Sequence, residues 1–226
     1  MSDEVALLTN LFESHRNEAN AGPMAKYMKN HFPFLGIKTP QRRELEKQFF
    51  HETGILKKPF HPGFVLELWD KTEREYQYTA LGYLEKLQKK LGKEDVAFLE
   101  GLITTKSWWD SVDVLAPKPV GTIAQKFPEV IGEAIEGWAV HENMWLRRAS
   151  ILFQLKYKQE TREEILFAYI RKNADSKEFF IQKAIGWALR EYSKTNPESV
   201  RVFIESHKLA PLSVREGSKY IKACQQ

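Results

Sequence analysis

The residues best suited to chemistry lie in one stretch, Lys106-Ser107-Trp108-Trp109-Asp110-Ser111-Val112-Asp113. On a helix, Trp109 and Asp113 are one turn apart and share a face, and the residues on either side of Trp109 point about 100° away. This face offers a flat aromatic surface beside a carboxylate, and both groups attract a cationic, ring-shaped ligand. The simpler interpretation is structural, because a tryptophan usually packs in a core and an aspartate near a helix start usually caps it.

Cationic side chains recur around tryptophans further along the chain. Trp145-Leu146-Arg147-Arg148-Ala149-Ser150 carries Arg148, and Lys156 follows two helical turns later. Four more residues follow the spacing i, i+4, i+7, i+11 of one helix face: Lys183, Trp187, Arg190 and Lys194. Such a stripe is a poor core face. It is either a solvated surface over a packed tryptophan or, inside a groove, a row of phosphate contacts around an aromatic platform.

Several other chemistries find no support in the sequence. There is no glycine-rich phosphate loop, and the 6 histidines show no spacing typical of metal ligands. The single cysteine, Cys224, lies close to the last residue, so we expect neither an intrachain disulfide nor catalysis by a Cys–His pair. A Ser–His–Asp triad is not excluded, but nothing indicates one.

Composition places the chain among globular proteins. It has 226 residues, of which 42% are hydrophobic and 28% charged. Residues 1–5 lack the basic start and apolar core of a signal peptide, so we expect none, and no apolar run is long enough for a membrane span. We therefore expect a reducing, cytoplasmic location. Residues 141–226 hold 16 Lys and Arg against 10 Asp and Glu, whereas the first 140 residues hold 18 against 20. The basic C-terminal part favours an anionic partner, with nucleic acid the first candidate.

The spacing of apolar residues is helical almost throughout, and no segment alternates polar and apolar residues convincingly enough to predict a strand. The predicted class is therefore all-α, with helix starts at Gly22-Pro23 and at Thr39-Pro40. Later helices are predicted over residues 72–91, 94–103, 143–158, 161–173, 177–194, 197–206 and 211–223. No linker divides the chain, so we expect one domain over residues 1–226.

A degenerate repeat runs through this series of helices. Tyr76, Trp109, Trp145 and Phe180 each begin a helix after a polar turn, and they lie 33, 36 and 35 residues apart. Helix pairs at this period are typical of an α-solenoid, in which each pair packs on its neighbours and the inner helices line a concave groove. An irregular helical bundle is the alternative.

Five segments closely resemble the AlkD family, bacterial DNA glycosylases built of HEAT-like helical repeats, and together they cover nearly the whole chain. The segments are Tyr27 to Phe32, Phe34 to Arg43, Lys106 to Asp113, Trp145 to Ala149 and Phe179 to Trp187. The resemblance implies a HEAT-like α-solenoid whose concave groove binds DNA.

The resemblance also implies an activity. Enzymes of this family excise N3- and N7-alkylated purines, typically 3-methyladenine and 7-methylguanine, from duplex DNA without strand cleavage, metal or cofactor, and the base can remain stacked. The family's catalytic positions correspond to Trp109, Asp113, Arg148 and Trp187. Tyr27 falls where the family lines its site, and the family's backbone contacts correspond to Thr39, Arg43, Lys156 and Arg190. Together with Lys183 and Lys194 of the basic stripe, these are the predicted DNA-binding residues. We expect a bacterial, cytoplasmic monomer associated with the nucleoid through DNA, without a membrane or an obligate protein partner.

Three functions remain open on the sequence alone. A glycosylase needs all four residues at the family's catalytic positions, which are Trp109, Asp113, Arg148 and Trp187. A non-catalytic HEAT-like protein that binds damaged or branched DNA needs the basic stripe but not Asp113. A protein-interaction solenoid would favour an apolar or acidic groove and would show little of the salt-dependent DNA binding expected of a basic groove.

Overall fold

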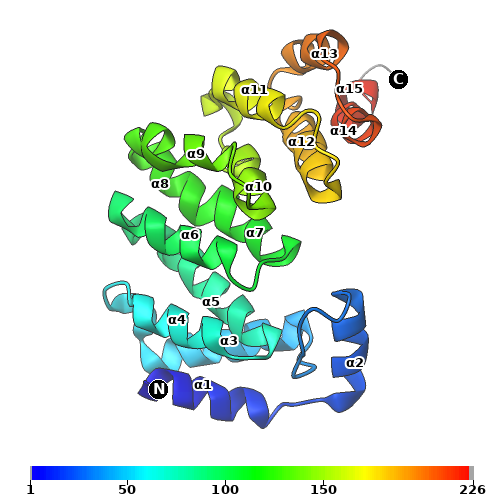
Figure 1. The fold of residues 1–226 in the computed structure, drawn as a ribbon. Coiled ribbons are helices and arrows are strands. Elements are labelled where there is room, and N and C mark those ends of the chain that lie inside the picture. The colour runs from blue at the N-terminus through cyan, green and yellow to red at the C-terminus, as the bar shows by residue number, and fades with distance from the viewer. Residues whose placement is uncertain (1, 224–226) are drawn as a thin grey trace. The chain divides into compact units, whose positions relative to one another are not determined.

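The computed structural model describes residues 2–223, and within this range the regular elements are all helical (Figure 1). The all-α class predicted from the spacing of apolar residues is confirmed. Cys224 lies outside the described residues. None of the helices between residues 2 and 223 is long and apolar enough to cross a membrane.

Contacts between residues divide the chain into two compact units, Met1–Lys90 and Leu91–Gln226. The single domain over residues 1–226 stays a prediction. Unit 1 contains five α-helices: α1 (Asp3–Glu13), α2 (Glu18–Tyr27), α3 (Thr39–Thr53), α4 (Pro62–Asp70) and α5 (Arg74–Leu87). Its core is formed by aromatic and aliphatic side chains from these helices, among them Phe12, Phe49, Phe64, Leu68 and Tyr83.

The start of α2 differs from the sequence prediction. The Gly22-Pro23 pair was expected to open this helix, but the helix begins at Glu18 and includes Pro23. The side chain of Asn17 accepts a hydrogen bond from the backbone N–H of Asn20 at 3.2 Å, which satisfies one of the unpaired donors at the helix start. An asparagine cap therefore determines where α2 begins, and proline is accommodated one turn and a half later.

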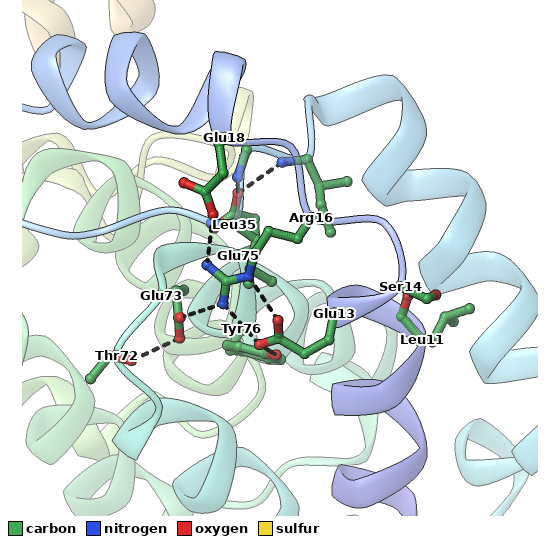
Figure 2. A network of polar contacts seen from close by, with 12 residues as sticks. Leu11, Glu13, Ser14, Arg16, Glu18, Leu35, Thr72, Glu73, Glu75 and Tyr76 are labelled. Atoms are coloured by element: carbon green, nitrogen blue, oxygen red, sulfur yellow. Dashed lines mark hydrogen bonds and ion pairs between the residues drawn. The ribbon is translucent and has the colours of Figure 1, made fainter.

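A buried glutamate fixes the loop between α2 and α3 (Figure 2). Glu75 accepts hydrogen bonds from the backbone N–H groups of Leu35, Gly36 and Ile37 at 3.0, 2.9 and 3.1 Å. Gly36 has a φ of +88°, and a Cβ there would collide with the backbone carbonyl oxygen of Asn17. The hydrogen bonds to Glu75 and the close approach of Gly36 to Asn17 together fix residues 35–37, which lead into α3.

A second polar cluster in Figure 2 ties the turn after α1 to the segment before α5. Arg16 donates to Glu13 at 2.8 Å and to Glu73 at 2.9 Å. These ion pairs fix the path of the chain between α1 and α2.

Unit 2 begins with α6 (Val96–Thr104) and α7 (Trp109–Leu115), and α7 continues through the π-helical segment Ala116–Val120 into α8 (Gly121–Lys126). The later helices are α9 (Glu136–Trp138), α10 (Met144–Leu152), α11 (Glu163–Lys172), α12 (Phe179–Tyr192), α13 (Pro197–Ser206), α14 (Pro211–Gly217) and α15 (Lys219–Ala223). The helix predicted over 211–223 is interrupted at Ser218.

The predicted repeat is visible in these helices. Each of Tyr76, Trp109, Trp145 and Phe180 lies within the first three residues of a helix, namely α5, α7, α10 and α12. Within unit 2, α10 packs against both α7 and α12. The small residues Ala149 on α10 and Ala184 on α12 are fully buried. Successive repeats in unit 2 therefore stack through their first helices.

Candidate active site

One open pocket in unit 2 brings together the four residues predicted to be catalytic. Its volume is about 290 Å³. The pocket is lined by residues of α7, α10, α12 and α14: Trp109, Asp113, Arg148, Phe179, Phe180, Lys183, Trp187, Arg190 and Glu216. The carboxylate and both tryptophans thus line one pocket although they come from different repeats.

A tight turn places the first two of these residues. Lys106 has a φ of 47°, in the left-handed region, and the hydroxyl of Ser107 donates to the carbonyl oxygen of Ile103 at 2.6 Å. The chain then leaves this turn in an extended conformation and enters α7 at Trp109. Asp113 follows one turn later, so both side chains lie on the pocket face of α7, as the spacing predicted.

Arg148 forms a bidentate ion pair with the carboxylate of Asp113. Its Nε donates to Oδ1 of Asp113 at 2.8 Å and its Nη2 donates to Oδ2 at 2.9 Å. The remaining Nη1 donates to the backbone carbonyl oxygen of Phe180, at the start of α12. Arg148 is only 4% exposed. A planar guanidinium bound on three sides fixes the orientation of the carboxylate and links three successive repeats.

An aromatic cluster supports this ion pair. The ring centroid of Trp108 lies 5.7 Å from that of Trp145 and 5.1 Å from that of Phe180, and the last two rings are 5.0 Å apart. These distances suit tilted and edge-to-face aromatic packing. Of the two adjacent tryptophans, Trp108 therefore supports the site and Trp109 lines it.

The environment of Asp113 changes its acidity. Burial is the largest effect and raises the pKa of the Asp113 carboxyl, because an ion is poorly solvated in the protein interior. The hydrogen bonds and positive charge of Arg148 lower this pKa and offset part of the increase, while the nearby Asp110 raises it further. The carboxylate is therefore little hydrated and oriented by its partner, as suits electrostatic stabilisation of a developing cation.

Two cations of the predicted stripe lie at this pocket and share one carboxylate. Lys183 donates to Oε1 of Glu216 at 3.1 Å, and Arg190 donates to Oε2 at 3.2 Å. Lys219 donates to Oε2 at 2.7 Å. Hydrogen bonds from Lys219 first and Lys183 second lower the pKa of Glu216 to about 2. Sequence reasoning missed Glu216, and no spacing pattern could have revealed it, because it lies 26 residues from Arg190.

The other two predicted cations of unit 2 lie elsewhere. Lys156 was expected on the same helix as Arg148, but α10 ends at Leu152 and Lys156 is exposed in the following turn. Lys194 was expected to continue the stripe, but α12 ends at Tyr192. Lys194 instead pairs with Glu191 at 2.7 Å and lines a different, smaller pocket. The stripe at the active-site pocket is therefore Lys183, Trp187 and Arg190.

The remaining predicted DNA contacts belong to unit 1. Tyr27, the last residue of α2, is 72% exposed. Thr39 and Arg43 are exposed on the first turns of α3, and their spacing of four places them on one helix face. All three side chains are thus accessible to a partner, and their roles in DNA binding stay predictions.

Known proteins share the family and the fold of this chain. The model of the DNA alkylation repair enzyme family matches residues 8–221. A structure described as a predicted DNA alkylation repair enzyme from Enterococcus faecalis is 36% identical, with a TM-score of 0.84 over 91% of this chain and 96% of that chain. The structure of smu.31 from Streptococcus mutans UA159 has a similar fold, with 18% identity and a TM-score of 0.59 over 79% of this chain and 96% of that one.

A search of curated proteins found no match. The family model nevertheless spans nearly the whole described chain, and the similarity to the Enterococcus faecalis protein extends over both chains. Together with the pocket formed by α7, α10, α12 and α14, these findings show that the chain belongs to the DNA alkylation repair enzyme family, as its AlkD-like segments predicted.

Proposed function

We propose that this protein is a monofunctional alkylpurine DNA glycosylase. It would hydrolyse the N-glycosidic bond of cationic N3- and N7-alkylated purines, such as 3-methyladenine and 7-methylguanine, in duplex DNA and leave an abasic site. Membership of the DNA alkylation repair enzyme family supports the enzymatic role and the DNA substrate. The observation that carries the proposal is the Asp113 carboxylate. Both of its oxygens accept hydrogen bonds from Arg148, and it lies in a pocket that is also lined by Trp109 and Trp187.

The chemistry follows from the charge of the substrate. Alkylation at N3 or N7 makes the purine cationic, so the electron pair of the breaking C1′–N bond neutralises the base as it leaves. No general acid is then needed, in contrast to the paired carboxylates of ordinary glycosidases. The sugar becomes an oxocarbenium-like cation, and water adds to C1′ and loses a proton. The protein must therefore stabilise positive charge near C1′.

The pocket residues suit these requirements. Asp113 would lie next to C1′, where its negative charge stabilises the cationic sugar and its oxygens accept a hydrogen bond from the attacking water. Trp109 and Trp187 would flank the sugar, because aromatic faces attract positive charge. Lys183 and Arg190 at the same pocket would contact backbone phosphates.

The pocket is open, and the lesion could be reached from the sugar and backbone side. We accordingly propose that the base remains stacked during excision, in contrast to glycosylases that flip the base into a deep pocket. A monomer acting on DNA without an obligate protein partner or cofactor completes the proposal.

Excision should depend on pH through Asp113. The reaction needs the ionised carboxylate, and the pKa of this group is raised by burial, so protonation begins at a higher pH than for an exposed aspartate. As the pH falls, we expect the single-turnover excision rate to decline at a midpoint above the ordinary aspartate value of about 3.9. Rates measured from pH 8 downwards, with protein-free depurination subtracted and folding followed by circular dichroism, would test this. A rate that stays constant to pH 4 in folded protein would contradict it.

The function itself is tested by comparing two duplexes that differ only in the lesion. One carries a cationic 7-methylguanine and the other a neutral uracil at the same position. We expect release of free 7-methylguanine and no release of uracil, because uracil would leave as an anion and the proposed mechanism assigns no group to protonate or stabilise it. Salt-sensitive binding of both duplexes without release of either base would instead indicate a non-catalytic DNA-binding protein.

A further inference from the structure

Glu216 lines the pocket and, unlike a typical surface glutamate, is buried. It lies on α14 and is 8% exposed. Gly186 on α12 makes this approach possible, because a Cβ at Gly186 would lie 2.5 Å from the Cβ of Glu216. Ser213, one turn earlier on α14, donates to the carbonyl oxygen of Gln182 at 2.9 Å. The close packing of α14 on α12 thus places a carboxylate beneath the cationic face of α12.

The carboxylate, which also pairs with Lys219 on its own side at 2.7 Å, engages Lys183 and Arg190 without covering them. Lys183 lies 3.1 Å from one carboxylate oxygen and Arg190 lies 3.2 Å from the other, so Glu216 bridges them two helical turns apart. The side chains of Lys183 and Arg190 are still 38% and 34% exposed. Each ion pair uses one donor nitrogen, whereas an ammonium has three N–H donors and a guanidinium five. Donors therefore remain for an anion that arrives from solvent.

We propose that Glu216 is a positioning residue that holds Lys183 and Arg190 in the orientation that binds backbone phosphates beside the lesion. This inference rests on the DNA-binding part of the proposed function. Lysine and arginine side chains lose considerable rotamer freedom when they are ordered at an interface, and a cation that is already ordered loses less on binding. A carboxylate that pairs with both cations thus favours phosphate binding although it is itself negative.

The positioning role predicts a change in duplex binding opposite to the one expected from net charge alone. Removing one negative charge from a DNA-binding protein should strengthen its attraction to DNA. If Glu216 acts by positioning, Glu216→Gln should instead weaken duplex binding, by about three- to ten-fold, because unordered cations must be ordered on binding. The single-turnover excision rate at saturating protein should change by less than about two-fold, because the substitution does not alter Asp113.

The experiment measures binding of Glu216→Gln to a duplex with one 7-methylguanine and to the same duplex without it, over a range of salt concentrations. Glu205→Gln is the matched control, because Glu205 is an exposed glutamate on α13 that pairs with Arg201 outside the pocket. A second comparison introduces Glu216→Gln into the Lys183→Gln/Arg190→Gln double variant, where it should have no effect beyond that of the control. Thermal unfolding confirms that each variant is folded.

The outcomes separate this inference from the proposed function. Weaker binding by Glu216→Gln, unlike Glu205→Gln, supports positioning, whereas binding as tight as that of the control overturns it. If Glu216→Gln does not fold, Glu216→Asp replaces it: the net charge is unchanged, so weaker binding supports positioning and unchanged binding overturns it. Base release by wild type is measured in the same samples. Its absence would refute the glycosylase, while the binding comparison would still decide the role of Glu216.

Discussion

Replacing Asp113 with asparagine is expected to slow base excision by about 10²- to 10³-fold, the range seen when one preorganised electrostatic group is removed from a catalytic site. Asparagine has nearly the same shape as aspartate and can still accept a hydrogen bond from Arg148. It lacks the negative charge that stabilises the oxocarbenium-like sugar. Duplex binding should therefore stay within about three-fold of wild type, because ground-state contacts are largely kept.

Single-turnover release of 7-methylguanine and equilibrium binding should be measured on the same protein samples. Asp175→Asn is the matched control, since Asp175 is exposed in the turn between α11 and α12 and its substitution changes the net charge equally. Excision by Asp113→Asn at the control rate would remove Asp113 from the mechanism. A parallel loss of binding and rate would assign it a role in DNA recognition instead.

Replacing Arg148 with methionine should have the largest effect on stability. The substitution removes two hydrogen bonds to Asp113 and leaves a largely buried carboxylate without its cation. Breaking a buried ion pair in this way costs about 3–5 kcal/mol. The pKa of Asp113 should rise further, because Arg148 is what lowers it. Excision at neutral pH should consequently fall, and the acid limb of the pH profile should move to higher pH.

Chemical denaturation of Arg148→Met, Asp113→Asn and the double variant would measure the free energy of unfolding and the coupling between the two residues. Arg147→Met is the control, because the neighbouring guanidinium donates to the backbone carbonyl oxygens of His141 and Glu142 at 2.6 and 2.9 Å, outside the pocket. It should cost only about 1 kcal/mol. Equal destabilisation by both arginine substitutions, with additive effects in the double variant, would contradict the structural role assigned to the Asp113–Arg148 pair.

The all-α class and the repeat could be predicted because they depend on local periodicity. Tyr76, Trp109, Trp145 and Phe180 mark helix starts that each follow a polar turn, and these starts lie within two residues of the observed ones. Helix ends were harder to predict. The helix through Arg148 is predicted to reach residue 158 but ends at Leu152. The spacing did not mark this end, because buried residues continue through Leu155 after the backbone has already turned.

The candidate site could be predicted only as a set of residues. The AlkD-like segments indicated Trp109, Asp113, Arg148 and Trp187, but the contacts between them required the structure. The carbonyl oxygen of Phe180 has no sequence signature, because every residue carries one. Glu216 is one of many glutamates, and its role depends on the packing of α14 against Gly186.

The most direct test of the proposed function uses a duplex with a single 7-methylguanine and excess wild-type protein. Free base is measured by chromatography, and strand integrity is measured on a gel before and after alkali. We predict stoichiometric release of 7-methylguanine and a strand that stays intact until alkali cleaves the abasic site. Intact DNA after alkali, with no free base and with salt-sensitive binding, would contradict a glycosylase. Strand cleavage before alkali would contradict a monofunctional one.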